Sequence, residues 1–101
     1  MRPIWRAMTS DLDTKRKQLA FRASHRGFKE ADLVLGGFAT ANLHRLDAGA
    51  LDEFDRLMAH ADQDIYDWVM DRRVPESDEF ASLLGRIRAF VRDGGAVVKR
   101  S

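Results

Sequence analysis

The spacing of apolar residues most constrains what this chain can fold into, because it follows the helical repeat along most of the sequence. The clearest case is the run from Phe80 to Val91, where large apolar residues recur three or four positions apart. That spacing places them on one face of a helix, which turns about once every 3.6 residues. No segment alternates apolar and polar residues as a half-buried strand does, and hairpin dipeptides are absent. The sequence therefore predicts an all-α fold.

Five helices are predicted, and together they form a small bundle whose fourth helix is short. Their approximate ranges are 12–25, 28–43, 48–61, 64–72 and 77–93. Ser10 or Asp11 is expected to cap the first helix, and Gly94-Gly95 to stop the last one. The second helix contains Gly36-Gly37, which we expect to pack closely against the first helix, since two glycines otherwise weaken a helix interior.

A single domain between flexible ends is expected. The chain has 101 residues, of which 45% are hydrophobic, enough for one small core. Residues 1–10 are expected to be a flexible N-terminal segment and residues 94–101 a flexible C-terminal tail. Residues 11–93 then form the all-α domain.

Charge is segregated along the chain, although the net charge is only +1. Residues 1–30 hold eight Lys and Arg against three Asp and Glu, and residues 31–80 hold four against twelve. Residues 81–101 are basic again, with five against one. The acidic middle argues against a protein that coats nucleic acid, because phosphates require a basic face. Segregated charge favours docking on another protein in one orientation.

Catalytic and metal-binding motifs are missing from the sequence. There is no cysteine, no Gly-x-Ser-x-Gly nucleophile elbow and no glycine-rich phosphate loop. The run Asp62–Asp67 begins like a calcium loop but lacks its glycine, so its aspartates are better explained by a helix N-terminus. The histidines His25, His44 and His60 contain no i, i+4 pair that would suit zinc. We expect neither an enzyme nor a metal protein.

No apolar run approaches the roughly 20 residues of a membrane-spanning helix, and no signal peptide is visible. We therefore expect no membrane span. We also expect a monomer. In the absence of a transit peptide, we expect it to be located in a bacterial cytoplasm.

The stretch SHRGFKE, residues 24–30, lies between the first two predicted helices and allows two interpretations. As a joint, Arg26 suits the C-terminal end of the first helix, and Gly27 takes the left-handed conformation that often follows a helix. Glu30 then suits the N-terminal end of the next helix. As a working surface, Gly27 admits a partner's backbone, while exposed Arg26 and Glu30 offer it a donor and an acceptor. The two interpretations are compatible.

The run FRASHRGFKEADLVLGGFATANL resembles the flavinylation (assembly) factors of succinate dehydrogenase, whose hallmark is Arg-Gly-x-x-Glu between the first two helices. Arg26, Gly27 and Glu30 match that hallmark, and Asp32 matches the Leu-Asp-apolar segment that follows it. Further on, LDEFDRLM and DQDIYDWVMDRRVP resemble the family's Leu-x-x-Phe-x-x-Leu and Asp-x-Asp-aromatic-x-x-Trp signatures. In this order and spacing the motifs are specific, and the likeness covers residues 11–91.

The resemblance implies a small all-α binding protein that is not an enzyme. Such factors bind the flavoprotein subunit of succinate dehydrogenase, or of fumarate reductase in some bacteria, and promote covalent attachment of FAD to a histidine of that subunit. The resemblance also implies that Arg26, Gly27 and Glu30 face this client, with Asp32 assisting. The factor itself is expected to hold no stable cofactor, because FAD belongs to the client. Direct contact with FAD is left open.

The alternative is a generic helical interaction module, antitoxin-like or nucleic-acid-binding. The first predicted helix carries the cations that such a module would use, Lys15, Arg16, Lys17 and Arg22. A run of this kind is more often a solvated helix face, and the apolar helix that follows does not suit a DNA groove. We therefore expect no nucleic-acid partner.

Overall fold

The structure is a helical bundle with no strand among the residues it describes. The computed structural model describes the backbone of residues 4–95 and the side chains of residues 12–95. In chain order, the elements are α1 (Ile4–Ser24), α2 (Lys29–Asn42), the 3-10 helix η1 (Leu43–Arg45), α3 (Ala48–Met58), α4 (Asp62–Val69) and α5 (Ala81–Arg92). The predicted all-α fold with a short fourth helix is confirmed. In the described part of the chain, no helix combines the length and the apolar character needed to cross a membrane.

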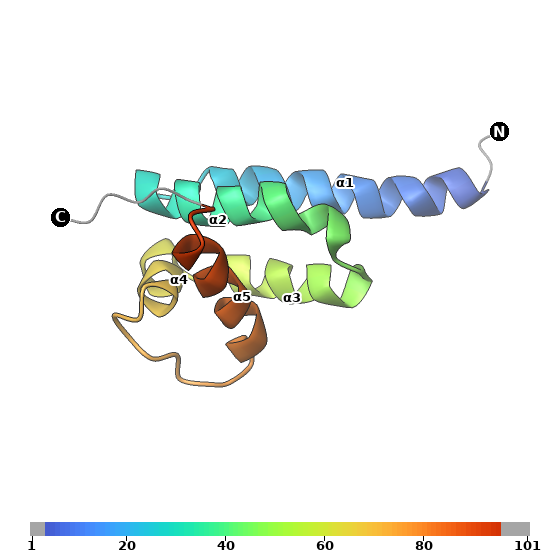
Figure 1. Ribbon diagram of the computed structural model, residues 1–101. Coiled ribbons are helices and arrows are strands. Elements are labelled where there is room, and N and C mark those ends of the chain that lie inside the picture. Colours follow the sequence, from blue (N-terminus) through green and yellow to red (C-terminus); the bar gives the residue numbers. More distant parts are fainter. Residues whose placement is uncertain (1–3, 96–101) are drawn as a thin grey trace.

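The first two helices form an antiparallel hairpin, and the other helices pack against it (Figure 1). The short turn between α1 and α2 lies at the same end of the molecule as α4 (Figure 1). α3 packs against α1 and leads into α4, whereas α5 packs against α2 and α4. This topology places the α1–α2 turn beside the α3–α4 turn, although the two are more than 30 residues apart in sequence.

The core is made of the apolar stripes that the spacing predicts. Phe38 of α2 and Phe54 of α3 lie at its centre, at most 1% exposed, with ring centroids 6.1 Å apart. Burying side chains of this size contributes roughly 1.5–3 kcal/mol each. The core residues include Leu19, Leu35, Phe38, Leu51, Phe54, Leu57, Ile65, Leu84 and Ile87. No polar or charged residue is buried among those whose side chains are described.

Gly36 marks the closest approach of α1 and α2. A Cβ atom at this position would lie 2.9 Å from the Cα atom of Ser24, closer than real Cβ contacts come. The predicted close packing against the first helix is therefore confirmed at Gly36. A Cβ at Gly37 would instead meet the Phe90 ring at 3.4 Å, which is ordinary van der Waals contact.

The helix boundaries differ from the predicted ones by three residues or more in four places. α1 begins at Ile4, so Ser10 and Asp11 lie inside the helix and do not cap it. Extending a formed helix backwards adds a hydrogen bond for each residue, and nothing after Pro3 blocks it. The flexibility predicted for residues 1–10 stays a prediction, and residues 96–101 lie outside the described part of the chain.

The other three differences concern α3, α4 and α5. α3 ends at Met58 and not at residue 61. α4 ends at Val69 because Asp71 adopts a left-handed backbone with φ 57°, and the Arg72 N–H donates back to the Asp67 carbonyl at 2.8 Å. α5 begins at Ala81 and not at Ser77, whose hydroxyl accepts a bond from a nearby backbone N–H and supports a turn.

The predicted stop at Gly94 is confirmed. This residue has φ +84° and follows the last turn of α5. The Gly95 N–H donates to the Phe90 carbonyl at 2.9 Å, and the Gly94 N–H donates to the Val91 carbonyl at 3.1 Å. This pair of bonds is the Schellman pattern, which favours glycine because it lacks a Cβ.

Candidate functional site

The turn between α1 and α2, residues Ser24–Glu30 and hereafter the corner, is fastened to the α3–α4 turn by Arg26. Its Nε donates to Asp62 Oδ1 at 2.6 Å, and Nη2 donates to the carbonyls of Met58 at 3.0 Å and His60 at 3.1 Å. The Arg26 side chain is only 9% exposed. The prediction that Arg26 is exposed is therefore wrong. The carbonyls at the end of α3 and a carboxylate on α4 attract the guanidinium inward.

Gly27 contacts the same carboxylate through its backbone. Its N–H donates to Asp62 Oδ2, and a Cβ built on Gly27 would lie 2.6 Å from that oxygen. Among the described glycines, Gly94 alone has a positive φ, so the predicted left-handed conformation of Gly27 is wrong. Glycine is favoured here because an internal side chain occupies the space that a Cβ would need.

Asp32 sets the point at which the chain leaves α1. Its Oδ1 accepts a hydrogen bond from the Arg26 backbone N–H, from within the first turn of α2. Between them Phe28 is half-buried and meets the ring of Tyr66 edge-on, with centroids 5.2 Å apart. The corner is therefore held by three contacts: the Asp32 and Asp62 carboxylates accept from its backbone N–H groups, and its Phe28 ring packs against Tyr66.

Glu30 points outward, as predicted. It lies in the first turn of α2, it is exposed, and its carboxylate makes no hydrogen bond or ion pair with the described residues. One turn further along the same face, Leu33 is 41% exposed. The corner therefore exposes the Glu30 carboxylate, with the apolar side chain of Leu33 beside it on α2, while Arg26 faces inward.

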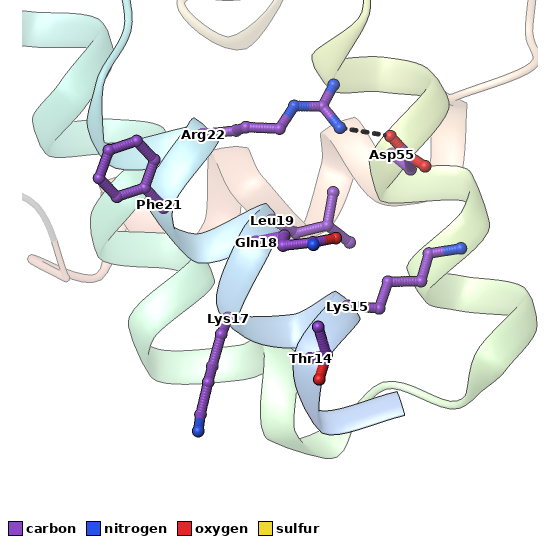
Figure 2. A pocket seen from close by; sticks show the side chains of 8 residues that line it. All are labelled: Thr14, Lys15, Lys17, Gln18, Leu19, Phe21, Arg22 and Asp55. Carbon is purple, nitrogen blue, oxygen red and sulfur yellow. Dashed lines mark hydrogen bonds and ion pairs between the residues drawn. The ribbon is translucent and has the colours of Figure 1, made fainter. Parts of the chain in front are cut away.

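The basic face of α1 is largely neutralised by α3. Lys15 pairs with Asp52, and Arg22 donates to Asp55 at 2.7 Å. The hydrogen bond and the charge of Lys15 hold the pKa of Asp52 below its ordinary value. Figure 2 shows Arg22 reaching across to Asp55, whereas Lys17 points away from α3.

Arg16 is also used inside the molecule. Its Nε donates to the Leu43 carbonyl at 3.0 Å and its Nη2 to the Leu46 carbonyl at 2.9 Å. These bonds satisfy carbonyls at the end of α2 and η1, where the helix dipole favours a cation. The cations that a nucleic acid would require are thus mostly engaged elsewhere, which disfavours the alternative function.

Asp62 is the residue of the site that sequence reasoning missed. The sequence places it correctly at the N-terminus of the fourth helix, and it is the first residue of α4. It does not indicate that both carboxylate oxygens bind the corner. The available signal was the Asp-x-Asp-aromatic-x-x-Trp signature, in which Asp62 is the first aspartate. Within the described residues, no group of three or more His, Asp or Glu side chains could hold a metal ion.

The chain is similar to known proteins. Residues 17–91 match the family described as "Flavinator of succinate dehydrogenase", a range that contains the whole corner and Asp62. The chain is 38% identical over 71 residues to succinate dehydrogenase assembly factor 2, mitochondrial, of Dictyostelium discoideum, covering 69% of this chain and 50% of that protein. It is 36% identical over 92 residues to the protein of the same name from Candida glabrata, covering 87% and 60%.

A bacterial protein is similar as well. The chain is 34% identical over 83 residues to the FAD assembly factor SdhE of Acetobacter pasteurianus, covering 82% of this chain and 73% of that protein. The chain therefore spans between about half and three quarters of the length of these curated relatives. Because the family match extends over most of the chain, from the last turns of α1 to the end of α5, the chain belongs to the family of succinate dehydrogenase flavinators.

Proposed function

We propose that this chain binds the flavoprotein subunit of succinate dehydrogenase and promotes covalent attachment of FAD to a histidine of that subunit. The observation that supports this most is the family match over residues 17–91, which includes the Arg-Gly-x-x-Glu corner. The bond-forming chemistry belongs to the flavin and to the flavoprotein, and FAD stays with the client. The factor contributes by holding the client in a conformation in which histidine and flavin meet.

Glu30 is the side chain best placed to contact the client. It is exposed, without a partner among the described residues, and fixed on a helix whose first turn is anchored by the corner. A carboxylate in this position can accept hydrogen bonds from a cationic or backbone donor of the client. Leu33 and the backbone of Gly27 extend the surface around it. Arg26 and Asp32 belong to the same site and support its geometry.

The test is to express the flavoprotein subunit with and without this chain and to measure covalent flavin by fluorescence on denaturing gels. We expect covalent flavin to depend on the chain and to fall in Glu30→Gln, which keeps the size of the side chain but removes its charge. Glu76→Gln is the matched control, because Glu76 is also exposed but lies in the α4–α5 loop. Running the fumarate reductase flavoprotein in parallel distinguishes the two clients.

Two outcomes contradict different parts of the proposal. If the wild-type chain neither binds the flavoprotein nor raises its covalent flavin, the proposed function is wrong. If the wild type acts but Glu30→Gln acts equally well, Glu30 is not a contact that matters.

A further inference from the structure

We propose that Asp62 is a positioning residue, through which Arg26 and Gly27 fix the part of the corner that the client contacts. This inference rests on the proposed function. It assigns to the Arg-Gly half of the corner an internal role, and it leaves the contact with the client to Glu30 and its neighbours.

The geometry of the Asp62 carboxylate is the first argument. Oδ1 accepts from Arg26 Nε at 2.6 Å, and Oδ2 accepts from the Gly27 N–H, so one carboxylate holds two consecutive residues. Asp62 begins α4, where the helix dipole favours a negative charge. Its side chain is 28% exposed, so these bonds lie partly shielded from water. Charge-assisted bonds of this kind are about twice as strong as neutral ones.

The short distance between Gly27 and the Asp62 carboxylate is the second argument. The Cβ of any other residue would lie 2.6 Å from Asp62 Oδ2 if nothing moved. The first atom that a side chain at position 27 would meet is therefore internal, the end of the flexible Asp62 side chain, which would have to turn away. Alanine at position 27 would push the carboxylate away and weaken its bond to Arg26.

The burial of Arg26 is the third argument. Its Nε donates to Asp62, its Nη2 donates to the carbonyls of Met58 and His60, and its Nη1 lies 3.7 Å from the Met58 sulfur. The side chain is 9% exposed, and a client would have to break those bonds to use Nε or Nη2. Arg26 therefore acts through Asp62 and the α3–α4 turn, whereas Glu30, a few residues later, remains exposed to the client.

A double-mutant cycle tests this arrangement. The dissociation constant of the full chain for the flavoprotein subunit is measured for wild type, Asp62→Asn, Arg26→Ala and the double variant, below the melting temperature of each. Asparagine keeps the size of Asp62 but loses the charge that Arg26 pairs with. We expect each single variant to bind the flavoprotein roughly tenfold more weakly than wild type. The double variant should bind no more weakly than the single variant with the larger loss, because the effects of coupled residues do not add. If Arg26 contacts the client itself, its loss adds to that of Asp62→Asn and the proposal is wrong.

A second cycle isolates the glycine. Gly27→Ala is expected to weaken binding in the wild-type background but to cost little more in Asp62→Ala, where the clashing oxygen is gone. Equal losses in both backgrounds would show that a partner, and not Asp62, requires the glycine. The Gly27 amide proton gives a readout independent of the client. We expect its NMR signal to move upfield in Asp62→Asn as the charged acceptor is lost, and an unmoved signal would overturn the proposal.

Ile87→Val separates positioning from general stability, because it removes one methylene from the core at α5, outside the corner. We expect this variant, once folded, to bind the flavoprotein as wild type does. If it loses affinity as Asp62→Asn does, the effect is one of stability and the positioning role is wrong. Failure of the wild type to bind would overturn the proposed function, whereas normal binding by Asp62→Asn would overturn this inference alone.

Discussion

Replacing Arg26 with alanine should destabilise the fold far more than its position in a turn suggests. The substitution removes an ion pair with Asp62 and two charge-assisted bonds to the carbonyls of Met58 and His60. It leaves the partly buried Asp62 carboxylate with only the Gly27 N–H as donor, and it removes the arginine donor from two carbonyls at the end of α3.

The magnitude follows from burial. Breaking a fully buried ion pair costs roughly 3–5 kcal/mol, and hydrogen bonds to charged groups contribute roughly 1.5–3 kcal/mol. Because Asp62 is 28% exposed, water can solvate it again in part. We therefore expect Arg26→Ala to lower the free energy of unfolding by about 2–3 kcal/mol. For a domain of this size, that corresponds to a fall of roughly 10–20 °C in Tm.

Arg22→Ala is the matched control, since it removes the same type of side chain four residues earlier in the chain. Its ion pair with Asp55 is exposed, with 44% and 41% of the two side chains accessible. Exposed pairs contribute about 0–1 kcal/mol. Urea unfolding followed by circular dichroism at 222 nm measures both variants, and an unchanged m value shows that the comparison is valid. Equal destabilisation by the two substitutions would refute the reasoning from burial.

Two further predictions concern other parts of the structure. Gly36→Ala should destabilise the fold by roughly 1–2 kcal/mol in thermal unfolding, because its Cβ meets the α1 backbone. Gly37→Ala should be neutral or stabilising. If Gly37→Ala were the more destabilising of the two, the close crossing at Gly36 would be contradicted. The stabilisation that Lys15 gives to ionised Asp52 is present above the ordinary pKa of 3.8 and is lost as the pH falls through the lowered pKa of the folded state. A Tm difference between wild type and Asp52→Asn should therefore be seen at pH 7 and vanish in acid, and a difference that persists below pH 3 would argue against the pair.

The helical fold could be read from the sequence because each helix carries its own apolar stripe. Phe38 and Phe54 are buried as their spacing predicts, and Gly94 ends α5 at the predicted stop. These features depend on neighbours within a few residues, which the sequence displays directly. The interior boundary at Ser77 was misread because a serine side chain supports a turn as readily as a helix start.

The corner could be read only in part because its bonds join distant segments. Sequence reasoning identified Arg26, Gly27 and Glu30, but it predicted an exposed Arg26, whose side chain is in fact mostly buried. The difference lies in the α3–α4 turn, whose carbonyls and carboxylate approach the corner only after the bundle has formed. The side chain of Asp62 marks a helix N-terminus in the sequence and becomes a ligand of the corner in the structure.

The separation of inward and outward residues changes how loss of function at the corner should be interpreted. A variant of Arg26 or Gly27 that fails to flavinylate its client does not thereby identify a contact residue, because both residues bind Asp62 inside the molecule. Glu30 has no such internal partner among the described residues, so its substitution changes the surface and leaves the joint intact. Stability and binding should therefore fall together in Arg26 variants, whereas binding alone should fall in Glu30→Gln. Measuring the free energy of unfolding and the affinity for the flavoprotein on the same preparations distinguishes the residues that position the corner from the residue that contacts the client.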